Sequence, residues 1–169
     1  MWLWVVTGIV VSVGFVAFTG APYVPSKRRD IVRAFTELYP LTSRDVLVDI
    51  GSGDGVVLRM ASARGARAIG YELHPILVAV SRYLSRHDSR VVVHLANFWR
   101  SKLPHDTTVV YVFGDARDIT KIFAHIEREV TRLGHDVSLI SYGFEIAGRK
   151  PTRTVGAHHL YHITPLQST

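Results

Sequence analysis

The stretch VLVDIGSGDGVV, residues 46–57, constrains the fold of this chain more than any other feature. Val46–Ile50 is apolar throughout apart from one aspartate, as a buried strand would be, and glycines follow at 51, 53 and 55. A glycine-rich turn between a strand and a helix lets a ligand approach the main chain, and the helix N-terminus offers unpaired N–H groups. The stretch therefore predicts a first βα unit with a ligand-binding turn.

Strand-like and helix-like segments alternate along the rest of the chain. We expect strands at 46–50, 68–72, 91–95, 108–113 and 137–142, and helices at 56–64, 75–87 and 118–133. Arg153–Val155 and His158–Ile163 flank Gly156 as a hairpin would. This alternation predicts an α/β fold, a Rossmann-like three-layer sandwich whose mostly parallel sheet ends in an antiparallel C-terminal hairpin. The length of 169 residues suits one such domain.

The N-terminal segment, residues 2–19, is apolar and carries no charge. As a helix it would be about 27 Å long, close to the roughly 30 Å of a hydrocarbon core. Trp2, Trp4 and Tyr23 suit the two interfaces, and basic residues follow from Lys27. We expect a single-pass membrane protein with a transmembrane anchor at 1–21 and the remaining chain on the cytoplasmic or mitochondrial matrix side. A signal peptide and a buried core helix are the alternatives.

Between the anchor and the first strand, two prolines in APYVP favour an extended segment. Ser26 then caps a predicted helix that runs to about Tyr39, with Ile31, Val32, Phe35 and Leu38 on one face. Its basic opposite face is consistent with a helix against a membrane surface.

The acids around the glycine turn narrow the choice of ligand. Val56 stands where a dinucleotide fingerprint needs glycine or alanine, no Walker lysine follows, and Asp49 and Asp54 would repel a pyrophosphate. A nucleoside that bears a positive charge suits the turn better, and S-adenosylmethionine is such a ligand. Glu72, at the end of the second predicted strand, is placed to accept hydrogen bonds from ribose hydroxyls. Asn97 follows the third strand and is suited to the adenine edge, with Phe98 or Leu73 over the ring.

Four motifs, PYVPS at 22–26, VDIGSGDG at 48–55, GYELHPILVAVSR at 70–82 and VYVFG at 110–114, carry a resemblance to known proteins. Over residues 26–165 the chain resembles the seven-stranded class I methyltransferases. Its apolar N-terminus and order of motifs resemble the membrane-anchored lysine methyltransferases that act on the c subunit of ATP synthase and on the adenine nucleotide translocase. The resemblance implies an anchor at 1–21, a pre-core motif and basic helix at 22–45, and a methyltransferase domain at 46–169.

The predicted cofactor contacts are Asp49, Gly51, Ser52, Gly53, Glu72, Leu73, Asn97 and Phe98. A lysine acceptor has an ordinary pKa of about 10.4 and must lose a proton before it accepts a methyl group. We assign Asp115 to contact with the substrate and Tyr23 to closure over the cofactor pocket. Asp115 is equally suited to cap a helix, and Tyr23 to anchor at the interface.

The expected activity is methylation of a lysine in a membrane-embedded protein, with S-adenosylmethionine as the cofactor. A methyltransferase for a lipid, quinone or other small molecule, and a cofactor-binding module without catalysis, are the alternatives. No metal is expected, because His158 and His162 would lie about 13 Å apart on a strand. The scattered arginines do not favour nucleic acid, and the absence of cysteine excludes disulfides and thiolate metal sites.

Overall fold

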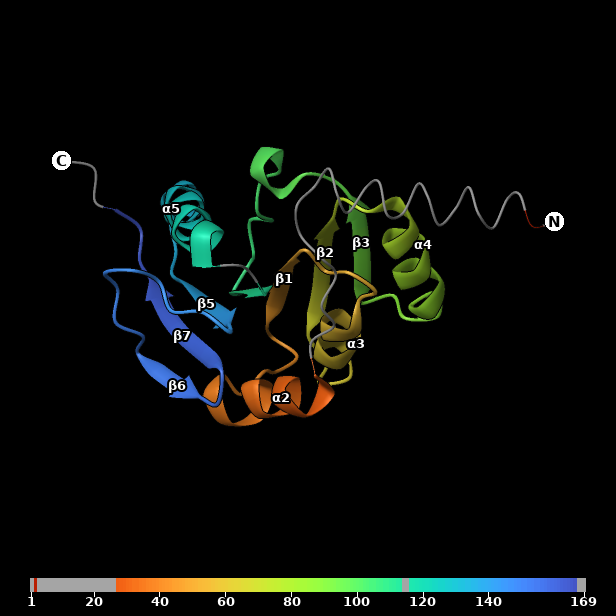
Figure 1. Ribbon diagram of the computed structural model, residues 1–169, viewed down its shortest axis with the longest axis horizontal. Coiled ribbons are helices and arrows are strands. Elements are labelled where there is room, and N and C mark those ends of the chain that lie inside the picture. Colours follow the sequence, from red (N-terminus) through yellow and green to blue (C-terminus); the bar gives the residue numbers. More distant parts are fainter. Residues whose placement is uncertain (1, 3–26, 114–115, 167–169) are drawn as a thin grey trace.

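The computed structural model describes residue 2 and residues 27–113 and 116–166 of the chain (Figure 1). A seven-stranded sheet of order β3-β2-β1-β4-β5-β7-β6 runs through this part. Strands β3 to β5 in that order are parallel, whereas β7 is antiparallel to both β5 and β6. The strands are β1 Val46–Ile50, β2 Arg67–Glu72, β3 Val91–Leu95, β4 Val109–Phe113, β5 Val137–Tyr142, β6 Arg153–Val155 and β7 His158–Ile163. The predicted strands and the C-terminal hairpin are confirmed.

Helices cover both faces of the sheet, which confirms the three-layer architecture (Figure 1). Helix α5, Ala116–Leu133, packs on one face; α3, Val56–Ser62, and α4, Pro75–Leu84, pack on the other with the short N-terminal helix α2, Arg28–Arg33. Strand β1 serves both layers, because successive side chains of a strand point to opposite faces. Val48 accordingly belongs to the α5 core and Leu47 to the opposite core.

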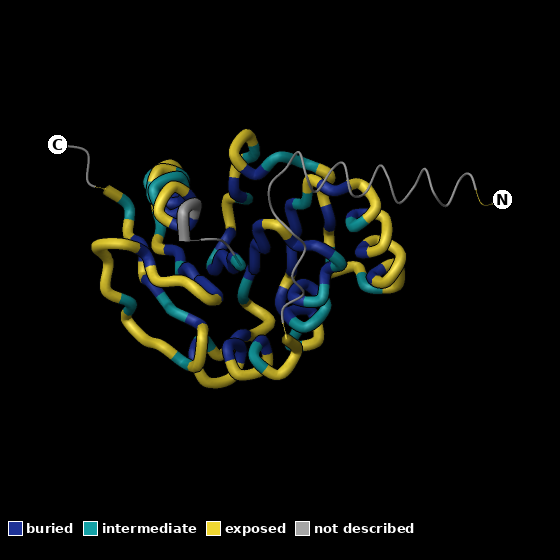
Figure 2. Tube along the Cα trace, viewed as in Figure 1, coloured by how far each residue is buried: buried dark blue, intermediate teal, exposed yellow. Residues whose placement is uncertain are grey.

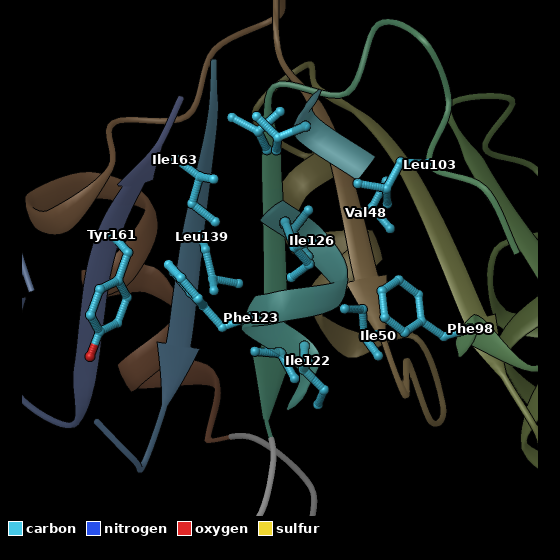
Figure 3. Close-up of a cluster of buried hydrophobic side chains, with 14 of the residues drawn as sticks. Val48, Ile50, Phe98, Leu103, Ile122, Phe123, Ile126, Leu139, Tyr161 and Ile163 are labelled. Carbon is cyan, nitrogen blue, oxygen red and sulfur yellow. The ribbon is translucent and has the colours of Figure 1, made fainter. Parts of the chain in front are cut away.

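The α5 core is a continuous apolar layer (Figure 3). Ile122, Phe123 and Ile126 project from α5 toward the sheet, where Leu139 of β5 and Ile163 of β7 are buried. The spacing of these α5 residues is that of one helical face, as predicted from the sequence. This packing holds the C-terminal hairpin to the parallel strands.

The predicted helix after Ser26 is present in a modified form. Helix α2 continues into a π-helical turn, η1 at Ala34–Leu38, and Lys27 is the N-cap. Ile31, Phe35 and Leu38 are buried as expected, but Val32 is 40% exposed, so its predicted place on the buried face is wrong. Val32 follows Ile31 by one residue, which rotates its side chain roughly 100° away from the sheet.

The predicted transmembrane anchor falls almost entirely outside the described residues, which include only Trp2 of the segment. Within the described ranges, no helix combines the length and the apolar character that crossing a bilayer requires. The tryptophan side chain is 82% exposed.

Candidate cofactor site

The strand order reverses at β1, which has β2 on one side and β4 on the other. In open α/β sheets, ligands bind in the crevice outside the carboxyl ends of the strands at such a point. The glycine turn begins there, directly after Ile50 at the end of β1. The backbone N–H groups of Gly51 and Ser52 both donate to the carbonyl of Tyr71 on β2, at 2.9 and 3.2 Å. The turn is thus held against the end of the neighbouring strand.

Three glycines give the turn its conformation. Gly51, Gly53 and Gly55 have φ angles of 73°, 54° and 79°, in the left-handed region that strains other residues. A Cβ on Gly55 would collide with Ser81 Oγ of α4, because Gly55 begins α3 in close contact with that helix. A Cβ on Gly51, in contrast, would meet no heavy atom of the described residues within 4 Å. Gly51 therefore presents bare backbone to open space, as a ligand cradle requires.

Gly70 of β2 provides a second close approach, beneath the turn. Its Cβ would lie 2.5 Å from Ser52 Oγ and 2.7 Å from Leu58 Cδ1 of α3. Only glycine lets the turn and the first helix pack this closely on the strand. Ser52 Oγ is buried and has no hydrogen-bond partner among the described residues. The hydroxyl is thus a polar group that this part of the chain does not satisfy.

Glu72 ties the turn to the next helix. One carboxylate oxygen accepts the N–H of Gly53 and the other accepts the N–H of His74, both at 2.8 Å. His74 is the N-cap of α4, so a single side chain at the end of β2 fixes two ligand-facing segments. Each oxygen keeps a further lone pair for a ligand hydroxyl, and the predicted ribose contact is compatible with this geometry.

Asp49 is a buried acid at the turn. Its side chain is 3% exposed, and burial raises the pKa of its carboxyl well above the ordinary value. The charges of Glu72 and Asp54 raise it further. A cationic ligand would offset this accumulation of negative charge. Arg59 already contacts Asp54, at 3.4 Å between Nη2 and Oδ2, so the excess charge lies on the Asp49 and Glu72 side.

The three residues that we predict beside the adenine differ in their surroundings. Asn97 caps the 3-10 helix η2, Phe98–Arg100, because its Oδ1 accepts the N–H of Trp99 at 3.0 Å. Phe98 is 5% exposed and packs against Tyr71 and other core side chains. Leu73 is 47% exposed. Of the two side chains predicted over the adenine ring, Leu73 is thus the one that faces solvent.

A polar network that the sequence did not reveal extends from the carboxyl end of β5 to the middle of β4. Tyr142 donates to Asp30 Oδ2 of α2 at 2.9 Å, and the backbone of Lys27 also bonds to its hydroxyl. The ring of Tyr142 stacks on His158 at 4.3 Å between centroids, and His158 Nε2 lies 2.9 Å from the Tyr111 hydroxyl. Burial lowers the pKa of His158 to about 4. The network fixes the start of α2, to which the pre-core motif connects.

Both predicted catalytic residues, Asp115 and Tyr23, lie outside the described residues. The three C-terminal histidines have separate partners: His158 pairs with Tyr111, His159 with Thr154 and Glu145, and His162 with Asp136. Within the described part of the chain, no three His, Asp or Glu side chains gather as a metal site would require.

These features fit S-adenosylmethionine. Among the described residues, nothing lies within reach of a Cβ on Gly51 and the Ser52 hydroxyl lacks a partner, and two carboxylates face a turn that lacks a phosphate-binding lysine. Five of the residues that we predict to contact the cofactor lie together around this turn: Asp49, Gly51, Ser52, Gly53 and Glu72. The sheet order, the hairpin and the turn together define a class I methyltransferase domain.

The chain belongs to the ANTKMT methyltransferase domain family, whose sequence profile matches residues 49–153. S-adenosylmethionine is the cofactor of this family of methyltransferases. The human lysine N-methyltransferase of the ATP synthase c subunit is 30% identical over 138 residues, which are 80% of this chain and 57% of the relative. The mouse protein of that name is 29% identical over 175 residues, covering 92% and 67% of the two chains. The chain thus spans a little over half the length of the human relative.

Among solved structures, an RNA methyltransferase from Salinibacter ruber in complex with S-adenosyl-L-homocysteine is 25% identical, with a TM-score of 0.74. The match covers 86% of this chain and 97% of that chain. A geranyl diphosphate methyltransferase in complex with S-adenosylmethionine is 20% identical, with a TM-score of 0.55 over 67% of this chain and 48% of its own. At that identity it supports the fold alone.

Proposed function

We propose that this chain is an S-adenosylmethionine-dependent protein-lysine N-methyltransferase that acts on a membrane-embedded protein. The observation that carries the proposal is the glycine turn with its two acids, Asp49 and Glu72, in a chain that belongs to the ANTKMT domain family. The curated relatives, which are named as lysine N-methyltransferases of the ATP synthase c subunit, support lysine as the acceptor.

The proposal divides the work of the site among its residues as follows. S-adenosylmethionine, when bound, supplies a methyl group on a sulfonium, so the leaving group is already activated. Gly51 and Gly53 admit the cofactor close to the main chain, Glu72 accepts from its ribose, and Asp49 offsets its positive charge. The chain then has to orient the acceptor amine, exclude water and keep that amine neutral. We assign the amine contact to Asp115 and closure of the pocket to Tyr23.

The same proposal includes a single-pass anchor at residues 2–19, with the methyltransferase domain on the cytoplasmic or mitochondrial matrix side. The uncharged apolar segment and the basic residues that follow, Lys27, Arg28 and Arg29, support this orientation. Tethering would raise the effective concentration of a membrane-embedded acceptor at the domain.

The test is incubation of membranes that lack the enzyme with the full chain and methyl-labelled S-adenosylmethionine, followed by separation of protein, lipid and RNA. We expect label in a membrane protein, on lysine after hydrolysis. The inactive variant is Gly53→Val, which places a side chain in the cradle. Gly148→Val is its matched control, because Gly148 also has a positive φ, 73°, and its Cβ would meet no described atom within 4 Å.

Two outcomes would redirect the assignment. Label in the lipid fraction would mean that the methyl acceptor is a lipid or quinone rather than lysine. Label in RNA would make this chain resemble its Salinibacter structural neighbour in activity as well as in fold. Equal labelling by wild type and Gly53→Val would show that the glycine turn is not the cofactor site.

A further inference from the structure

Helix α4 carries apolar side chains on the face that is turned away from the sheet. Val78 is buried against the protein, whereas the exposed fractions of Ile76, Val80, Tyr83 and Leu84 are 47%, 39%, 65% and 48%. Their spacing of four, three and one residues places all four within one stripe of the helix. We call these four residues the α4 apolar face. Scattered exposed apolar side chains are ordinary, but a contiguous patch marks an interaction site.

Helix α4, which carries this face, lies at one end of the described part of the chain, beside the sheet edge formed by β3 (Figures 1 and 2). Val92 and Leu95 of β3 are also exposed, at 41% and 53%. The outer side of α4 is largely exposed along its length in Figure 2. The patch is therefore accessible from the end of the sheet that is remote from the C-terminal hairpin.

Within the segment that carries this face, the charged residues are basic, and the nearest acid after it is Asp88. The sequence from Leu73 to His87 contains no aspartate or glutamate, and its charged residues are Arg82 and Arg86. The Arg86 guanidinium lies over the Tyr83 ring, 4.3 Å from the centroid, and also donates to the Tyr83 carbonyl at 2.8 Å. An aromatic ring with an apolar body and a cation beside it is typical of side chains at a membrane interface. The basic rim complements anionic headgroups.

The edge strand is poorly suited to pairing with another strand. Arg82 donates to the carbonyl of Val93 from Nε and Nη2, at 2.9 and 2.7 Å. A charged side chain across an edge carbonyl is a common way to discourage edge-to-edge association. This argues against a second copy that would extend the sheet, and favours a partner that takes up side chains rather than backbone bonds.

We propose that the α4 apolar face inserts into the headgroup region of an anionic bilayer. Ile76, Val80 and Leu84 enter the boundary between headgroups and acyl chains, while Tyr83 and Arg86 lie at the level of the phosphates. The contact is distinct from the proposed anchor at 2–19 and goes beyond the proposed function. A tether alone leaves the domain free to rotate, whereas a second contact fixes which side of the domain faces the membrane.

The experiment uses fluorescent labels, because the chain contains no cysteine and a single introduced thiol is therefore unique. Val80→Cys and Tyr83→Cys carry an environment-sensitive fluorophore on the α4 face, and Arg128→Cys carries it at an exposed position of α5. Each full-length variant is reconstituted into phosphatidylcholine vesicles with or without phosphatidylserine. Brominated lipid and aqueous iodide are the quenchers. Unchanged circular dichroism and S-adenosylmethionine affinity establish that each variant is folded.

We expect brominated lipid to quench the probes at 80 and 83 several-fold more than the probe at 128, and iodide to show the reverse order. Phosphatidylserine should strengthen this difference. Arg86→Glu should lower the fraction of protein with α4 inserted by on the order of fivefold or more, since each basic residue at an anionic surface contributes about that factor. The difference in quenching should shrink accordingly. The measured quantity is quenching and does not depend on methyl transfer. The proposed membrane contact of α4 can therefore hold even if lysine is not the acceptor.

Three results would overturn the proposal. Equal lipid quenching at 80, 83 and 128 would mean that the anchor merely brings the whole domain near the bilayer. Shielding of 80 and 83 from both quenchers, with energy transfer between labelled copies, would make the face a contact with a second copy. The same shielding without such transfer would mean that another part of this chain covers α4.

Discussion

Substitution of Gly70 by alanine tests whether the turn and the first helix depend on close packing against β2. The φ angle of Gly70 is not positive, so the backbone itself accepts alanine. The new Cβ would nevertheless lie 2.5 Å from Ser52 Oγ, 2.8 Å from Ser52 Cβ and 2.7 Å from Leu58 Cδ1. Ordinary contacts between carbon atoms are about 3.5–4.0 Å. Ser52 and Leu58 must therefore each move by roughly 1 Å.

Two opposing effects set the size of the change. Replacing glycine by alanine at a compatible site stabilises a protein by about 0.4–1 kcal/mol through the unfolded chain. Overpacking of a core costs about 1–3 kcal/mol. We expect a net loss of roughly 1–2 kcal/mol in the free energy of unfolding. Because Ser52 belongs to the cofactor turn, the affinity for S-adenosylmethionine should fall as well.

Urea unfolding and calorimetric titration with S-adenosylmethionine measure the two effects. Gly70→Ala combined with Ser52→Gly removes two of the three close contacts, so the double variant should regain part of the stability that the clash removed. Gly134→Ala is the comparison, because Gly134 has a φ of 78° and its Cβ would meet no described atom within 4 Å. That variant should lose stability through backbone strain without losing cofactor affinity. Wild-type stability and affinity in Gly70→Ala would refute the packing argument.

Three further changes test the charges and hydrogen bonds. Burial raises the pKa of Asp49, so the free energy of unfolding falls as pH rises from the ordinary pKa of 3.8 toward the raised one. Asp49→Asn should remove this loss of stability and make the protein more resistant to urea at neutral pH. The same variant should weaken binding of S-adenosylmethionine more than binding of S-adenosylhomocysteine. Glu72→Gln should lose one of the two backbone bonds and weaken cofactor binding about tenfold to a hundredfold in calorimetry. The pKa of His158 is lowered from 6.5 to about 4, so the folded protein favours the neutral imidazole by on the order of 3 kcal/mol. This contribution to stability should be present above pH 6.5 and be lost as pH falls toward 4. His158→Phe should flatten the unfolding profile between those pH values.

Sequence patterns located the parallel strands well because most of them are apolar runs between turn residues, and Gly156 marked the C-terminal hairpin. The ends of helices were less predictable. Helix α3 ends at Ser62 rather than Arg64, and α4 ends at Leu84 rather than His87. Ala63 and Arg64 beyond α3 favour helix formation, and Arg86 beyond α4 does so too, but the chain turns back toward the next strand. Where a helix ends is thus set by the distance to its next partner in the sheet, and propensity does not report that distance.

The centre of the site was predictable for a topological reason. The glycine turn and Glu72 follow neighbouring parallel strands, whose carboxyl ends meet at one edge, so their proximity follows from the strand order alone. The supporting contacts were not predictable in this way. Tyr142 and Asp30 are separated by 112 residues, and nothing in either local pattern indicates the other. The role of Gly70 likewise depends on Ser52 and Leu58, which belong to the preceding βα unit.

The acids around the turn lead us to expect that the site discriminates between the methyl donor and its product. Acids outnumber bases among the described residues of the turn: Asp49 is buried near Glu72 and Asp54, and Arg59 pairs with Asp54. S-adenosylmethionine carries a sulfonium that this charge favours, and S-adenosylhomocysteine has lost it. Two unit charges near a protein surface interact by a few kcal/mol at contact distance, and by less when farther apart. If the chain transfers methyl groups as proposed, the reaction removes this attraction, and we expect calorimetry to show weaker binding of the product than of the donor.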